Sequence, residues 1–242
     1  MFAPSIEGAN TYQELGMWHV AANRWPQAAA RYAAQVYSLT TADASDTDNV
    51  SRDLMPAASS LCEAGNFTEY ENLRDVAIRR FGLTGNPTVA EQVIKTSMLR
   101  PASREILLSL EPLVERVTAA VKAHDKLHSG GDSYMAAWRC LALSLYHYRS
   151  GDFTAAEKWA ARCLFYPDEN HPREACARLV RSMALHQLHR PEESRKELLA
   201  ARERIGGKVD GYLASDWTKR EYWFDWVNAR VLLREASALT GG

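Results

Sequence analysis

Two histidines stand four residues apart in the segment His124-Asp125-Lys126-Leu127-His128. Residues at positions i and i+4 of a helix share one face, so the two imidazoles could hold one zinc ion. A zinc site also needs a third and a fourth ligand, and the sequence offers none at a recognisable spacing. Because a Gly-Gly break follows directly, we expect a solvated helix end at His124 and His128 and no metal site.

A second candidate chemistry is nucleophilic catalysis by Ser144 with His147 as its base. Such a set requires the serine, the histidine and an acid to converge. We instead expect Ser144 to fill a position where two helices approach closely and a small side chain is needed, and His19 to occupy the equivalent position of His147. The chain has no G-x-S-x-G elbow, no H-E-x-x-H and no P-loop. The sequence therefore predicts no catalytic residues and no cofactor, and the protein is not expected to be an enzyme.

The C-terminal part of the chain gathers large aromatic side chains that could cage a ligand: Trp217, Tyr222, Trp223, Phe224 and Trp226. The alternative, which we favour, is a final helix that starts after Ser215 or Asp216 and covers the last apolar face of a helical stack.

The elements that position these residues belong to a chain of ordinary globular composition, with 242 residues, 46% hydrophobic and 24% charged. The 29 Lys and Arg balance the 30 Asp and Glu, which argues against nucleic acid as a partner. The four cysteines are widely spaced, the start lacks a signal-peptide pattern, and no apolar run is long enough to span a membrane. We expect a cytoplasmic protein with reduced thiols and no membrane association.

Helix-favouring runs alternate with short and long breaks along the whole chain. The short breaks fall at 23–25, 65–67, 100–102, 151–153 and 188–191, and longer breaks lie between them. No stretch shows strict period-two alternation, so strands are not expected. This alternation predicts an all-α protein made of helix pairs.

Two of the expected helix pairs fit the tetratricopeptide pattern W-x₂-L-G-x₂-Y, then A-x₃-F. Tyr12-x₂-Leu15-Gly16-x₂-His19 is followed by Ala28-x₃-Tyr32, and Cys140-x₂-Leu143-Ser144-x₂-His147 by Ala156-x₃-Ala160. The small residues Gly16 and Ser144 would let the two helices of a pair approach. We therefore expect one domain over residues 1–242, a tetratricopeptide-like right-handed superhelix of about five helix pairs with a C-terminal capping helix.

The middle segment, residues 87–128, has helical stripes but no match to this pattern. Pro101 and Pro112 stand where new helices could begin, because proline is tolerated in a first turn. An enzyme built on the same helical stack would use this segment.

Residues 142–205 and 222–239, and more weakly 22–33, resemble the helical-repeat region that ends large multidomain bacterial serine/threonine protein kinases. The resemblance implies a protein-interaction module, either a fragment or a free-standing relative. Kinase activity is not implied, because the Gly-rich loop, the His-Arg-Asp loop and the Asp-Phe-Gly motif are absent.

In that family geometry the concave groove is lined by first helices of the pairs. The matching positions in this sequence are predicted to be the binding residues: Gln13, Met17, Trp138, Tyr148, Arg149, Met183 and His186. The expected function is a scaffold that binds a protein or peptide segment in this groove. The alternatives are an enzyme or metal site in the central segment, and an oligomerisation module.

Overall fold

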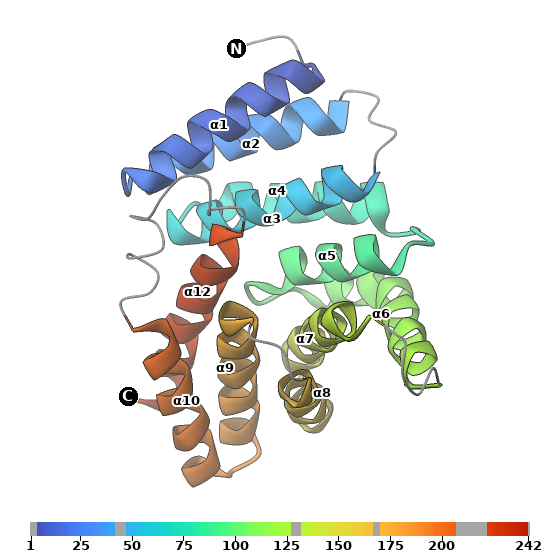
Figure 1. Ribbon diagram of the computed structural model, residues 1–242, viewed down its shortest axis with the longest axis vertical. Coiled ribbons are helices and arrows are strands. Elements are labelled where there is room, and N and C mark those ends of the chain that lie inside the picture. Colours follow the sequence, from blue (N-terminus) through green and yellow to red (C-terminus); the bar gives the residue numbers. More distant parts are fainter. Residues whose placement is uncertain (1–3, 42–46, 127–131, 167–169, 207–221, 242) are drawn as a thin grey trace.

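A computed structural model describes residues 4–41, 47–126, 132–166, 170–206 and 222–241. These residues form eleven α-helices, in agreement with the expected all-α class (Figure 1). The helices are α1 (Ile6–Ala21), α2 (Trp25–Thr41), α3 (Thr47–Glu63), α4 (Phe67–Phe81), α5 (Pro87–Met98), α6 (Arg104–Lys126), α7 (Ser133–Ser150), α8 (Phe153–Phe165), α9 (His171–Gln187), α10 (Pro191–Ile205) and α12 (Trp223–Thr240).

Side-chain caps fix where many of these helices begin. Ser5, Asn66 and Asp152 each accept a hydrogen bond from a backbone amide in the first turn of α1, α4 and α8. Asn86 and Asn170 do the same for α5 and α9, where proline also stands in the first turn. Each cap satisfies an amide that has no partner inside its helix.

The tight turns inside helix pairs share one backbone device. Asn23, Gly65, Gly151 and His189 have φ angles of 55°, 72°, 83° and 58°, which places all four in the left-handed region. At three of these turns the next amide donates to a carbonyl five residues earlier, from Arg24 to His19, Asn66 to Leu61 and Arg190 to Leu185. This bond closes the helix end in the manner of a Schellman cap. The short breaks expected from the sequence are therefore confirmed.

Consecutive helices pack in pairs, and alternate helices pack side by side. α1 lies against α2, α7 against α8, and α9 against α10, while α3, α5, α7 and α9 follow one another (Figure 1). α5 is the most enclosed of them, because every residue from Val89 to Met98 is buried.

Gly16 permits the close approach of α1 and α2. A Cβ atom at this position would lie 2.7 Å from a ring carbon of Tyr32, which is fully buried. Ser144 is likewise fully buried and donates to the carbonyl of Leu141. The expected small-residue positions therefore do lie in packed interfaces.

The structure locates the helix starts expected at the two prolines and near the C-terminus. Pro101 precedes α6, but Pro112 lies inside α6, so the expectation that a new helix begins there is wrong. Pro112 is exposed, and the carbonyl that loses its amide donor can bind water instead. The expected final helix is present as α12 and begins at Trp223, whereas Ser215, Asp216 and Trp217 lie outside the described residues.

Candidate functional site

α12 closes a ring of helices. It packs on α9 and α10, as a terminal cap would, but also reaches α3, so that α3, α5, α7, α9 and α12 contact one another in succession. Figure 1 shows α12 between α3 and the α9–α10 pair. We call these five helices the inner ring.

The burial of α12 shows that it belongs to the core. Six of its large apolar side chains are at most 8% exposed: Trp223, Phe224, Trp226, Val227, Val231 and Leu232. At about 1.5–3 kcal/mol each, their burial contributes roughly 9–18 kcal/mol before the entropy cost of ordering the helix is subtracted. α12 is therefore part of the hydrophobic core.

The inner ring encloses several of the expected groove residues. Trp138 is 6% exposed and Met183 is fully buried, while His186 and Tyr148 are half-buried, the latter against the ring of Phe153. Arg149 donates to both carboxylate oxygens of Glu235 on α12. These five residues are thus packed inside the fold or bonded to it.

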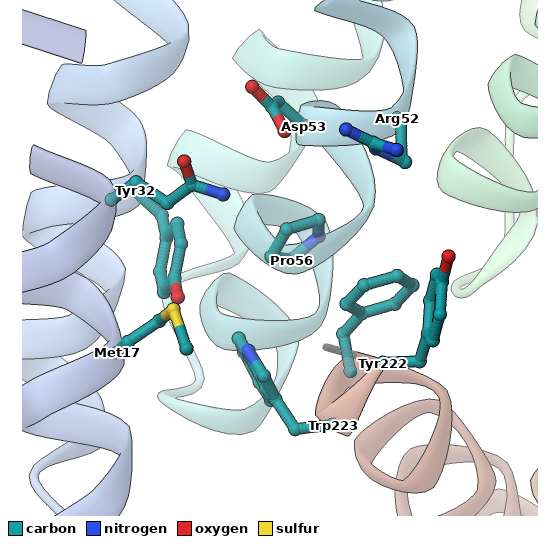
Figure 2. Close-up of a pocket in the computed structure, with 9 residues that line it drawn as sticks. Met17, Tyr32, Arg52, Asp53, Pro56, Tyr222 and Trp223 are labelled. Atoms are coloured by element: carbon teal, nitrogen blue, oxygen red, sulfur yellow. The ribbon is translucent and has the colours of Figure 1, made fainter. Parts of the chain in front are cut away.

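The other two expected groove residues, Gln13 and Met17, do line a cavity. This cavity, the Trp223 pocket, has a volume of about 220 Å³ and lies between α1, α2, α3 and the start of α12 (Figure 2). Its lining residues are Gln13, Met17, Tyr32, Arg52, Asp53, Pro56, Tyr222, Trp223 and Phe224.

The walls of the Trp223 pocket combine apolar and polar side chains, and its aromatic rings are held by packing. Trp223 is buried against Tyr32, with ring centroids 5.7 Å apart, and against Trp25 at 6.2 Å. Tyr222 remains 42% exposed. The favoured interpretation of the C-terminal aromatic residues is supported, since Trp223, Phe224 and Trp226 are buried in the core. The ligand cage stays a prediction, and Tyr222, Trp223 and Phe224 line the cavity where it would lie.

The lining of the Trp223 pocket includes a proline inside a helix. Pro56 lies inside α3 and has no amide proton, so the carbonyl of Arg52 lacks its usual intrahelical donor. On the same helix, the carboxylate of Asp53 accepts a hydrogen bond of 3.2 Å from Gln35.

A second, smaller cavity adjoins the first. This Lys95 pocket has a volume of about 130 Å³ and shares Arg52, Tyr222 and Phe224 with the Trp223 pocket. The rest of its lining is Met55, Thr88, Glu91, Gln92, Lys95, Tyr134, Met135, Trp138 and Asp225.

Buried charges stand at the back of the Lys95 pocket. The ammonium of Lys95 lies 2.7 Å from a carboxylate oxygen of Glu91 and 4.0 Å from the centre of the Trp138 ring. Arg173, 2% exposed, lies 5.6 Å from the same ring. Burial raises the pKa of Asp225 to about 7, although Lys95 and Arg173 act against the rise. Burial acts to lower the pKa of Lys95, but the nearby carboxylates of Glu91 and Asp225 have the larger effect. The net result is a raised pKa of Lys95.

This charged cluster was not expected from the sequence. Glu91 and Lys95 stand at i and i+4 in the segment without a repeat pattern, which is a common surface spacing. The signal that could have indicated it is Asp225, an acid between Phe224 and Trp226 in an aromatic run.

The histidines and cysteines show no converging set in the described residues. His124 lies against Tyr166, with ring centroids 5.8 Å apart, whereas His128 lies outside the described residues. Within the described part of the chain, no three His, Cys, Asp or Glu side chains gather as a metal site would require. The four cysteines are buried and free of disulfides, as expected. Burial lowers the pKa of His147, opposed by Asp152 at 3.8 Å.

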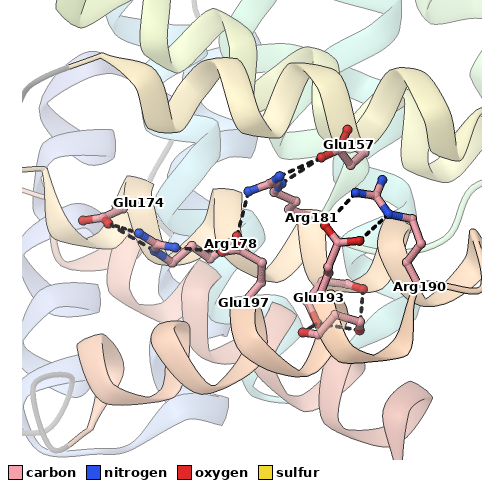
Figure 3. A network of polar contacts seen from close by, with 9 residues as sticks. Glu157, Glu174, Arg178, Arg181, Arg190, Glu193 and Glu197 are labelled. Carbon is pink, nitrogen blue, oxygen red and sulfur yellow. Dashed lines mark hydrogen bonds and ion pairs between the residues drawn. The ribbon is translucent and has the colours of Figure 1, made fainter.

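The charged residues of α8, α9 and α10 form a network of ion pairs (Figure 3). Arg178 and Arg181 each lie 2.7 Å from a carboxylate oxygen of Glu197, and Arg181 also binds Glu157 at 2.9 Å. At the start of α10, Arg190 binds Glu193 at 2.6 Å. The mixed charges expected on solvated faces are thus partly used to join helices.

Comparison with known proteins provides no identity: no family model, no curated protein and no solved structure matches the chain. None of the helices in the described ranges is long and apolar enough to cross a membrane.

Proposed function

We propose that this protein is an interaction scaffold of tetratricopeptide-like helix pairs that binds a segment of another protein at the Trp223 pocket. The repeat arrangement is supported by the left-handed residues in four tight turns and by the succession of α3, α5, α7 and α9. The equal spacing from Leu15 to Ala28 and from Leu143 to Ala156 adds to this support. In this proposal the pairs build a right-handed superhelix whose groove α12 fills.

The observation that carries the proposal is the Trp223 pocket itself. Its volume of about 220 Å³ is below the roughly 300–1,000 Å³ of small-molecule sites. A cavity of this size accommodates one large side chain of a bound segment. The apolar part of the lining favours an aromatic or long aliphatic side chain, and the polar part, which includes Gln13 and Arg52, can bind the backbone of the segment.

Peptide display on the purified protein tests this function. A random twelve-residue library is selected against the wild type, and the affinities of the enriched peptides are measured by fluorescence polarisation. We expect a recurrent aromatic or long aliphatic residue. Met17→Ala should weaken binding about tenfold, as expected for loss of an anchoring contact.

A matched control is available on the same helix. Trp18 is 49% exposed and does not line the pocket, so Trp18→Ala should bind the peptides like the wild type. Thermal melts of both variants check that they are folded. If no peptide is enriched, or if Met17→Ala and the wild type bind equally, the proposal is wrong.

The charged cluster of the Lys95 pocket supports one alternative function, an enzyme whose substrate places only a small reacting group in this cavity of about 130 Å³. Glu91, Lys95 and Asp225 converge there, and a carboxyl with a pKa near 7 can both give and take a proton. A thermal-shift screen of small acids and amines tests this alternative. A compound that stabilises the wild type but not Asp225→Asn would support it, and the absence of such a compound favours the scaffold.

The wider setting is part of the same proposal. The resemblance of residues 142–205 to the repeat region of bacterial kinases supports an accessory module of a cytoplasmic signalling protein. A partner protein that presents the anchoring side chain would connect this module to its pathway.

A further inference from the structure

A larger cavity lies at the other end of α12, away from the Trp223 pocket. This Arg100 cavity has a volume of about 550 Å³ and is bounded by the end of α3, the start of α4, the end of α5 and the second half of α12. Arg100, Phe67, Glu63, Arg234 and Glu235 supply its charged and aromatic lining, and Cys62, Leu99, Pro101 and Val231 its apolar lining. Unlike the Trp223 pocket, it falls within the size range of small-molecule sites.

The lining of this cavity holds two arginines, Arg100 and Arg234, and two glutamates, Glu63 and Glu235. Arg230 and Arg234 share the single carboxylate of Glu63, at 3.0 and 2.8 Å. Glu235 is already paired with Arg149. Both lining glutamates are thus engaged by arginines, whereas Arg100 forms no ion pair with a carboxylate among the described residues and keeps its charge available at the cavity.

Helix ends of both signs border the cavity, since α3 ends there and α4 begins there. Arg149 donates to the carbonyls of Met98 and Leu99, both at 3.1 Å, and Arg74 donates to that of Pro101 at 3.1 Å. The negative end of α5 is therefore capped. The start of α4, where a helix carries partial positive charge, borders the cavity through Gly65 and Phe67.

Arg100 and Phe67 form a flat surface beside this charge. The guanidinium carbon of Arg100 lies 3.5 Å from the centre of the Phe67 ring, and Phe67 is 40% exposed. Planar guanidinium groups and aromatic rings both stack on flat ligands. Burial raises the pKa of the Cys62 thiol to about 12, so Cys62 serves as an apolar wall and not as a nucleophile.

We infer that the Arg100 cavity binds a small organic anion that carries a flat ring. The anionic group pairs with Arg100 and Arg234, and the ring lies against Phe67 and the apolar wall. This site is separate from the Trp223 pocket, so either assignment can fail without the other.

Fluorescence titration with 8-anilinonaphthalene-1-sulfonate tests the site, because this probe combines a flat ring system with an anionic group. We expect saturable binding by the wild type, weakened about tenfold in Arg100→Gln, the effect of losing one charge-assisted hydrogen bond. Arg234→Gln should also weaken binding, since that side chain is exposed and its loss leaves the core intact.

Three controls make the outcome decisive. Arg195→Gln, which removes an exposed arginine on α10, should bind the probe like the wild type. Met17→Ala should do the same, since Met17 lines the other pocket. The neutral analogue N-phenyl-1-naphthylamine should bind more weakly than the sulfonate. Equal binding of the neutral analogue, or unchanged binding by folded Arg100→Gln, would overturn the inference.

Displacement of the probe distinguishes the kinds of anion. Benzoate and adenosine 5′-monophosphate, which carry rings, should displace it at lower concentrations than inorganic phosphate does. If inorganic phosphate displaces it equally well, the ring has no role and the inference is wrong. If an acidic peptide displaces it and the ring-bearing anions do not, the cavity is instead a contact for an acidic protein segment.

Discussion

Asp225 should make the stability of this protein fall as the pH rises. Its carboxyl lies on the first turn of α12, is 5% exposed and faces Lys95 and Glu91 on α5 and Arg173 on α9. Burial raises its pKa from 3.8 to about 7 in the folded protein, while in the unfolded chain it returns to its ordinary value.

The sign follows from proton counting. Between pH 4 and pH 7 the folded protein keeps a proton on Asp225 that the unfolded chain has lost, so raising the pH favours unfolding. The difference between 3.8 and about 7 corresponds to about 4 kcal/mol, fully present below pH 4 and lost above pH 7. Asp225→Asn removes the titrating group and should remove this loss.

Urea unfolding followed by tryptophan fluorescence at pH 4.5, 6, 7 and 8 measures the effect. The gap in unfolding free energy between the wild type and Asp225→Asn should change across this range by a few kcal/mol, in favour of the variant at high pH. Asp75→Asn, an exposed aspartate on α4, should run parallel to the wild type. Parallel curves for Asp225→Asn, or a gap that moves the other way, would refute the assignment of a buried, mainly protonated carboxyl.

Three further substitutions test the packing. Gly16→Ala should lower the unfolding free energy by about 1–3 kcal/mol, because the new methyl group meets the ring of Tyr32; an unchanged value in chemical denaturation would contradict the close approach of α1 and α2. Glu197→Gln should cost about 1–2 kcal/mol by weakening the pairs of two partly buried arginines with a buried carboxylate, a loss that added salt reduces and that a salt titration of the melting temperature measures. Gly151→Ala should cost about 1–2 kcal/mol, because φ is +83° there, whereas Gly241→Ala at the end of α12 should cost less in the same melts.

The sequence predicts the turns of this fold because their causes are local. A left-handed residue must follow a helix for a Schellman cap to form, and Gly65, Gly151 and Asn23 belong to the residue types that adopt that conformation most readily. The prediction of a helix start at Pro112 was wrong. A proline on the exposed surface of a helix lowers stability less than one in a packed interior, so α6 continues through Pro112.

Contacts between residues far apart in the chain set the position of α12. No pattern in the sequence indicates which residues make these contacts. A run of apolar residues at the C-terminus predicts burial but does not name the surface that buries it. Ser59 on α3 donates to Asn228 at 2.6 Å, and the two residues are 169 positions apart. A sequence pattern that lacks this contact predicts open groove positions for Trp138, Met183 and Arg149, which α12 and its neighbours cover or bind.

α12 contributes to cavities at both of its ends. Displacing this helix would expose the six large apolar side chains that its packing buries. A ligand that leaves α12 in place can still use the cavities beside it. The Trp223 pocket at its start is small and lined by both apolar and polar side chains, and the Arg100 cavity near its end is larger and lined by charged, aromatic and apolar side chains. Because both are built partly from α12, any substitution that shifts this helix along the ring should alter both cavities at once, whereas a change at Met17 or Arg100 should alter only one.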